Sequence, residues 1–185
     1  MRLFEELKLL PNQITLIRIV LIPFLVYFAY REELVLFLVL YIIASLSDLF
    51  DGLAARKMGI SSEFGSIFDA SADMLLVFTM IPVLYFLAPA ILSKYLMVIG
   101  VIIAMALVRI LIVAIKFKGK AALHLYTGKA SMVALFFGML LLLLTGIDYL
   151  IVCFLVLVIL DLIEEIAIML TRATLDLDTK SIFLK

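Results

Sequence analysis

Six long apolar segments constrain what this chain can fold into. They run over residues 14–30, 34–50, 66–87, 95–115, 130–144 and 149–170. Each is close to the length of about 20 residues that an α-helix needs to cross a bilayer, and the segments lack the short alternating pattern of barrel strands. Because backbone polar groups in lipid must be paired within their own segment, we expect six transmembrane helices.

The composition excludes several other classes of protein. Hydrophobic residues make up 67% of the chain and charged residues only 16%, whereas a soluble domain averages about 45–50% and about 25%. Lys and Arg balance Asp and Glu at 15 each, so no overall basic charge favours nucleic acid as a partner. One cysteine, Cys153, excludes an intramolecular disulfide and a paired-cysteine metal site. We predict a single all-α membrane domain over residues 1–185.

The distribution of positive charge predicts the orientation. Most Lys and Arg residues fall on the side that holds both termini, and the opposite loops hold only Arg31 and Lys94. Cytoplasmic loops of membrane proteins carry such an excess. We therefore expect a multi-pass protein of the cell membrane with both termini in the cytoplasm.

The first ten residues have a different pattern from the spans. Leu3, Phe4, Leu7 and Leu10 would share one face of a helix, with charged residues elsewhere. This pattern is typical of a short amphipathic helix in the membrane interface. Pro11 would end that helix before the first span.

Four carboxylates lie where acids are costly, near the ends of the second and third spans. Asp48 and Asp51 are three residues apart and Asp69 and Asp73 are four apart, so each pair shares a helix face. The short connection predicts antiparallel neighbours whose carboxylate pairs face each other. Oxygen ligands without Cys or His suit Mg²⁺ or Mn²⁺. Arg56 adds a side chain that can donate two hydrogen bonds to a phosphate. This combination predicts phosphoryl-transfer chemistry at the bilayer surface.

The spacing of these residues resembles that of a known family. The pattern Asp48-x2-Asp51-Gly52-x2-Ala55-Arg56-x8-Gly65-x3-Asp69-x3-Asp73 is similar to the signature of the CDP-alcohol phosphatidyltransferases. The resemblance implies an enzyme that transfers a phosphoalcohol unit from a CDP-linked donor to a hydroxyl group and releases CMP. It also implies a pair of Mg²⁺ or Mn²⁺ ions held by the four aspartates, with Asp73 also serving as general base.

The same resemblance implies a donor pocket for the nucleotide. Its members would be the motif residues Gly52, Ala55, Arg56 and Gly65, the loop residue Ser62, and the entry segment with Asn12, Gln13, Thr15 and Arg18. Gly52 would leave bare backbone for the cytosine to pack on, and Arg56 would contact the donor phosphates or the nucleotide. For Asn12 and Thr15, a helix cap and the start of a span explain the residue types nearly as well.

Basic residues on the same side of the membrane are candidates for binding a phosphorylated acceptor. These are Arg109, which is the one charge inside the fourth span, Lys129 and Lys116. For Lys116 the alternatives are a topology signal or contact with lipid headgroups. For Asp161, Glu164 and Glu165 the pattern predicts solvation at the interface or pairing with Arg172 or Arg109, and no chemical role.

The resemblance is nearest to the phosphatidylglycerophosphate and phosphatidylinositol-phosphate synthases, so glycerol phosphate is the expected acceptor. However, Asp69-Ala-Ser-Ala-Asp73-Met74 lacks a proline and a lysine that glycerophosphate-using relatives usually carry there. Inositol phosphate and then serine remain alternatives. The donor would be CDP-diacylglycerol or an archaeal ether equivalent, and the family's habit is a homodimer. A membrane metal-ion transporter is the alternative from another class.

Overall fold

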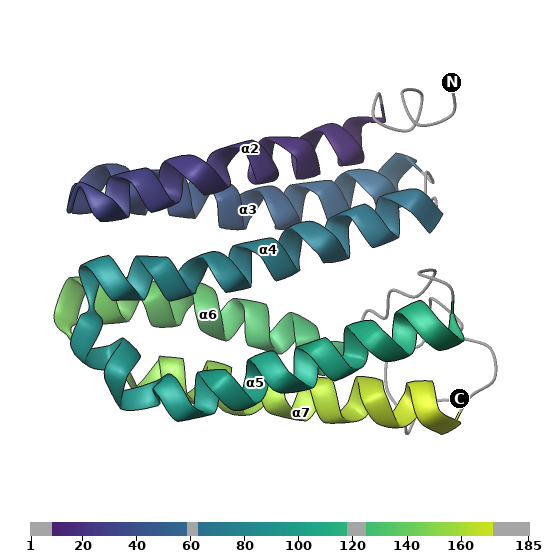
Figure 1. The fold of residues 1–185 in the computed structure, drawn as a ribbon. Coiled ribbons are helices and arrows are strands. Elements are labelled where there is room, and N and C mark those ends of the chain that lie inside the picture. The colour runs from purple at the N-terminus through teal and green to yellow at the C-terminus, as the bar shows by residue number, and fades with distance from the viewer. Residues whose placement is uncertain (1–8, 59–62, 118–124, 172–185) are drawn as a thin grey trace. The chain divides into compact units, whose positions relative to one another are not determined.

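The computed structural model describes residues 9–58, 63–117 and 125–171, and all regular structure in these ranges is α-helical. The helices are α2 (Leu10–Tyr30), α3 (Leu34–Met58), α4 (Glu63–Leu87), α5 (Pro89–Lys116), α6 (Tyr126–Thr145) and α7 (Tyr149–Thr171) (Figure 1). The prediction of an all-α membrane protein is therefore confirmed.

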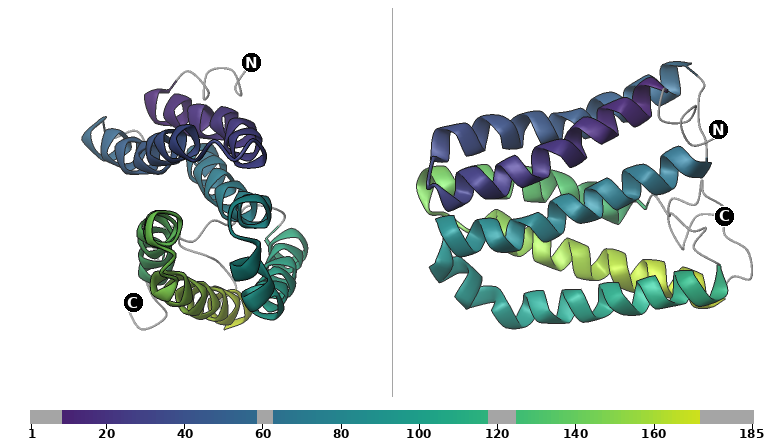
Figure 2. Two further views of the ribbon diagram at one scale, coloured as in Figure 1. Left: turned by 90° about the vertical axis from the view of Figure 1, so that its left-hand side faces the viewer. Right: turned by 45° about the horizontal axis from the view of Figure 1, so that its top comes forward.

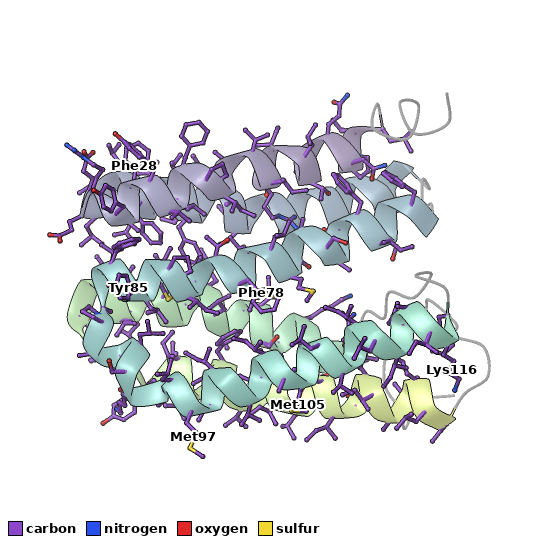
Figure 3. The ribbon with its side chains drawn as sticks, viewed as in Figure 1. Phe28, Phe78, Tyr85, Met97, Met105 and Lys116 are labelled. Carbon is purple, nitrogen blue, oxygen red and sulfur yellow. The ribbon has the colours of Figure 1, made fainter. Side chains whose placement is uncertain are left out.

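The helices have the length and the surface of membrane helices. In the part of the chain described, α2, α4, α5 and α6 are each long and apolar enough to cross a bilayer, and α3 contains a shorter apolar stretch, Leu34–Ser47. Large apolar side chains face outward: Val35 is 74% exposed, Met97 86% and Ile115 81%. Met97 points away from the ribbon in Figure 3. A soluble protein rarely exposes so much apolar surface, whereas lipid would cover it favourably.

Among the predicted boundaries that differ from the structure, two are informative. Lys94 was expected in a loop before the fourth span, but it lies inside α5, and only Ala88 separates α4 from α5. Pro89 begins α5, a position where its missing N–H is not needed. Ser93 and Lys94 lower the local hydropathy without ending the helix, so hydropathy alone placed the start too late. Of the expected interfacial helix over residues 1–10, residues 1–8 lie outside the described ranges, and Leu10 already belongs to α2.

The chain divides into two compact units, residues 1–92 and 93–185, and each is described by itself. In the first unit, α2 packs against both α3 and α4 (Figures 1 and 2). Ala29, Ala44 and Ala72, one from each helix, are fully buried. Small residues let membrane helices approach closely. Because α2 is the shared neighbour, a residue on its inner face can contact both other helices.

In the second unit, α6 packs against α7, and Gly138 sets how closely they approach. A Cβ added to Gly138 would lie 3.2 Å from the backbone of Leu150 and 3.1 Å from the side chain of Ile151. The two helices are connected by a short turn in which Gly146 adopts a left-handed conformation (φ 75°) and its N–H donates to the Leu142 carbonyl at 2.8 Å. This is a common way to end a helix, and it turns the chain directly into α7.

The α6–α7 turn is also tied to the beginning of α5. Lys94 Nζ and the Tyr95 hydroxyl both donate to Asp148 Oδ2, at 2.7 and 2.8 Å. The hydrogen bond from Lys94 holds the pKa of Asp148 below its usual range. The carboxylate thus stays charged over the physiological pH range and links the two segments.

We expect Gly138→Ala to destabilise the second unit by about 1–3 kcal/mol, since the new methyl group meets backbone that cannot easily give way. The matched control is Gly100→Ala in α5, where no described atom lies within 4 Å of the added Cβ. That change should be neutral or stabilising by up to about 1 kcal/mol, from helix propensity. Thermal unfolding in detergent measures both. Equal effects of the two substitutions would contradict the close approach at Gly138.

Candidate active site

The arginine at position 18 joins the three helices of the first unit. Its Nη1 donates to Asp73 Oδ1 at 2.6 Å and to Asp69 Oδ1 at 3.1 Å, and its Nε donates to Ser47 Oγ at 3.3 Å. Arg18 lies on α2, Ser47 on α3 and the two aspartates on α4. Arg18 is 0% exposed. One guanidinium group therefore connects all three helices at a single buried point.

The helical period explains why the two aspartates meet there. Residues four apart lie one above the other on a helix face, and Asp69 and Asp73 both reach the same nitrogen of Arg18. Their side chains are 26% and 27% exposed, so part of each carboxylate remains accessible. Ser71, between them in sequence, is exposed and donates within its own helix, to the Ile67 carbonyl at 2.7 Å. The predicted shared face of Asp69 and Asp73 is confirmed.

The chemistry of this donor set suits a hard divalent ion. The described ranges contain no group of three or more His, Cys, Asp and Glu that could hold a metal, and they contribute two converging carboxylates, Asp69 and Asp73. Mg²⁺ usually binds through one or two carboxylates and completes its shell with water and substrate phosphates. The two aspartates therefore fit such an ion.

The second unit holds another buried ion pair, between Arg109 on α5 and Glu165 on α7. Both Nε and Nη2 of Arg109 contact the Glu165 carboxylate, the latter at 3.2 Å. The two side chains are 18% and 6% exposed. Of the alternatives expected for the C-terminal acids, pairing with Arg109 is the one that the structure shows for Glu165. The expectation that Arg109 binds an acceptor phosphate stays a prediction.

The remaining acids of α7 stabilise the beginning of α6. Thr127 Oγ1 lies 2.8 Å from Asp161 Oδ1 and 3.1 Å from Glu164 Oε2. Both oxygens of the Asp161 carboxylate lie so close to Gly128 that an added Cβ would be 3.1 Å away. Negative charge is favourable at a helix N-terminus, where backbone N–H groups lack partners. Asp161 and Glu164 thus have a structural role that the sequence did not reveal.

Lys116 contacts the C-terminal end of α7. Its Nζ donates to the carbonyls of Met169 at 2.6 Å and Leu170 at 3.3 Å, which are among the last in the helix. Figure 3 labels Lys116 at the end of α5. A cation is favourable at a helix C-terminus. Lys129 is exposed near the start of α6, and acceptor binding by either lysine stays a prediction.

Comparison with known proteins decides the family. The family model for CDP-alcohol phosphatidyltransferases matches residues 8–175. This chain belongs to the CDP-alcohol phosphatidyltransferase family. The match extends over both compact units, so the family resemblance is not confined to the aspartate motif.

Curated relatives carry a more specific name, CDP-diacylglycerol--glycerol-3-phosphate 3-phosphatidyltransferase. The protein of that name from Rickettsia typhi is 40% identical over 74 residues, covering 38% of this chain and 42% of the relative. Those from Aquifex aeolicus and Salmonella choleraesuis are each 38% identical, covering 37% of this chain and 38% and 39% of the relatives. The chain thus matches about two fifths of the length of these relatives.

The structure describes the two halves of the phosphatidyltransferase signature differently. It describes only the backbone of the half on α3, and the backbone and side chains of the half on α4. α3 continues to Met58, so the stretch containing Asp48, Asp51, Gly52, Ala55 and Arg56 is helical. Their side chains, and Ser62, lie outside the described part of the structure. Gly65 is half-buried in the first turn of α4. The predicted meeting of the two carboxylate pairs therefore stays a prediction.

The entry segment forms the first turns of α2. The residue preceding the helix is Leu9, so the alternative interpretation of Asn12 as the helix cap is wrong. Asn12 and Thr15 are buried, Gln13 is exposed, and Thr15 Oγ1 donates to the Pro11 carbonyl at 3.2 Å. Asn12, Thr15 and Arg18 are spaced three residues apart and so form a buried polar stripe on one face of α2. That stripe was the available signal for the Arg18 site, whose pairing with Asp69 and Asp73 sequence analysis missed.

We expect Glu165→Leu to cost about 3–5 kcal/mol of stability, because it leaves the Arg109 guanidinium buried without its carboxylate. Replacing both partners, Arg109→Leu with Glu165→Leu, should restore stability to within about 1–2 kcal/mol of the parent. Thermal unfolding in detergent provides the comparison. A single variant as stable as the parent, or a double variant less stable than the single one, would contradict the buried pair.

Proposed function

We propose that this chain is a phospholipid-biosynthetic transferase that moves a phosphatidyl group from a CDP-lipid to glycerol phosphate and releases CMP. The observation that carries the proposal is the convergence of Asp69 and Asp73 on one buried cation within a chain of this family. The names of the curated relatives support glycerol 3-phosphate as the acceptor. CDP-diacylglycerol, or an ether-linked equivalent, is the proposed donor.

Asp73 is the proposed general base. Its carboxylate would accept the proton of the acceptor hydroxyl as that oxygen bonds to the lipid-bearing phosphorus. The bond from that phosphorus to the CMP oxygen breaks, and CMP leaves with the electron pair. A general base must lie within hydrogen-bond reach of the proton it takes. The partial exposure of Asp73 supports the role, because a substrate hydroxyl can approach it.

Members of this family are generally metal-dependent, and we propose that Asp48, Asp51, Asp69 and Asp73 hold a pair of Mg²⁺ or Mn²⁺ ions. When bound, such ions would offset the negative charge of the pyrophosphate and of departing CMP. The nucleotide would contact the residues of α2, α3 and the following loop that the family resemblance implies. Those residues are Asn12, Gln13, Thr15, Gly52, Ala55, Arg56, Ser62 and Gly65.

The acceptor phosphate would bind to Arg109, Lys129 and Lys116. Arg109 already contacts Glu165 through two nitrogens, and a guanidinium has five N–H donors, so it can bind a phosphate while it remains paired.

We further propose that the active site and both termini face the cytoplasm at the cell membrane, from the distribution of Lys and Arg, and that the chain forms a homodimer. Inositol phosphate and serine are the alternative acceptors.

The test is CMP release by the purified chain in detergent with CDP-diacylglycerol and Mg²⁺ or Mn²⁺. Glycerol 3-phosphate, glycerol 1-phosphate, inositol phosphate, inositol and serine are supplied separately. We expect CMP release with glycerol 3-phosphate. Asp73→Asn should lower the rate of CMP release by about 10²–10⁴-fold, because it removes the proposed base and a proposed metal ligand. Ser71→Ala is the matched control on the exposed face of α4 and should keep the parent rate.

Each other outcome has a definite meaning. CMP release with a different acceptor would identify that acceptor in place of glycerol phosphate and would leave the proposed reaction class unchanged. CMP release that survives Asp73→Asn would exclude Asp73 as the base. The absence of CMP with every acceptor and both metals would contradict the proposed transferase and favour the alternative of metal-ion transport.

A further inference from the structure

We propose that Arg18 is a positioning residue that holds Asp69 and Asp73 together as their counter-cation before a divalent ion binds. The inference rests on the proposed function in that it takes these aspartates to be metal ligands. It gives Arg18, which the family resemblance placed in the donor pocket, a task that is separate from contact with the substrate.

The burial of Arg18 is the first argument. A guanidinium that is 0% exposed has lost its hydration, and such a loss is offset only by paired charges and good hydrogen bonds. The two carboxylates of α4 provide them, at 2.6 and 3.1 Å. The dependence is mutual, because two carboxylates that share one site repel each other unless a cation lies between them. A neutral side chain at position 18 could fill the same space but would leave that repulsion in place.

The geometry of the guanidinium is the second argument. The Ser47 hydroxyl donates to the Ala44 carbonyl at 2.7 Å, so its oxygen is oriented to accept from Arg18 Nε at 3.3 Å. That contact fixes the guanidinium from α3, while Nη1 reaches both aspartates on α4. Three helices therefore determine where the positive charge lies.

Pairing with Arg18 leaves the two carboxylates able to bind a metal. One guanidinium offsets one of the two negative charges. The contacts to Arg18 at 3.1 and 2.6 Å use Oδ1 of Asp69 and Asp73, and a carboxylate can accept several bonds at once because it has two oxygens and about four lone-pair sites. The pair is thus held together by Arg18 and keeps acceptor capacity for a divalent ion.

The experiment compares thermal unfolding of Arg18→Met in two backgrounds, with a chelator present. In the parent, we expect the substitution to lower Tm by on the order of 10 °C, because it leaves two carboxylates facing each other without their cation. In an Asp69→Asn, Asp73→Asn background, it should lower Tm by less than half as much. A side chain that only fills space would give the same loss in both backgrounds, and that result would overturn the proposal.

Two further variants sharpen the test. Arg18→Lys keeps a positive charge that can reach both carboxylates and should recover most of the lost Tm. Ser47→Ala removes only the Nε contact and should have a small effect. If Arg18→Met yields no folded protein, recovery of folded protein in the Arg18→Met, Asp69→Asn, Asp73→Asn triple variant would support the proposal, and failure of both this triple variant and Arg18→Lys would overturn it.

A last measurement separates this inference from the proposed function. Adding Mg²⁺ or Mn²⁺ should raise Tm more in Arg18→Met than in the parent, since the ion then supplies the missing positive charge. An equal rise in both proteins would contradict the role as counter-cation. A parent that binds neither ion and releases no CMP would refute the proposed function, whereas the comparison made in chelator would still report on Arg18.

Discussion

The first unit depends on one buried arginine. Arg18 is buried within a membrane helix, and carboxylates on α4 and a hydroxyl on α3 accept hydrogen bonds from it there. The same contacts hold α3 and α4 against α2 and bring Asp69 and Asp73 to the same guanidinium. Charges that are costly in an apolar environment thus determine which helices are neighbours. The packing of small residues such as Ala29, Ala44 and Ala72 then permits the approach that the ion pairs require.

In the second unit, other charged side chains are also paired within an apolar environment. Arg109 pairs with Glu165 across α5 and α7, and Asp161 and Glu164 meet the first turn of α6 through Thr127. Lys116 meets the carbonyls at the end of α7. Each charged group in this set is matched to an opposite charge or to a helix end of opposite polarity. These contacts explain why charges that looked anomalous in an apolar sequence do not prevent the helices from packing.

Sequence alone predicted much of the fold, because helices in lipid need a simple feature, an apolar run of sufficient length. It also predicted that Asp69 and Asp73 share a face, which follows from helical period within one segment. It placed the start of α5 too late, at Tyr95, since hydropathy falls at Ser93 and Lys94 within the first turns of the helix. It missed the pairing of Arg18, because spacing along a chain does not reveal which helix lies against which. The role of Asp161 was missed for the same reason, since Thr127 and Gly128 are distant in sequence.

The central claim is that the carboxylates fixed around Arg18 form a metal-dependent site for a CDP-linked donor. Titration of purified protein with CMP, with and without Mn²⁺, tests this claim without requiring the acceptor to be known. The account predicts CMP binding that strengthens when Mn²⁺ is present and is lost in Asp69→Asn. CMP binding that is the same with and without Mn²⁺, or that is unchanged in Asp69→Asn, would contradict it.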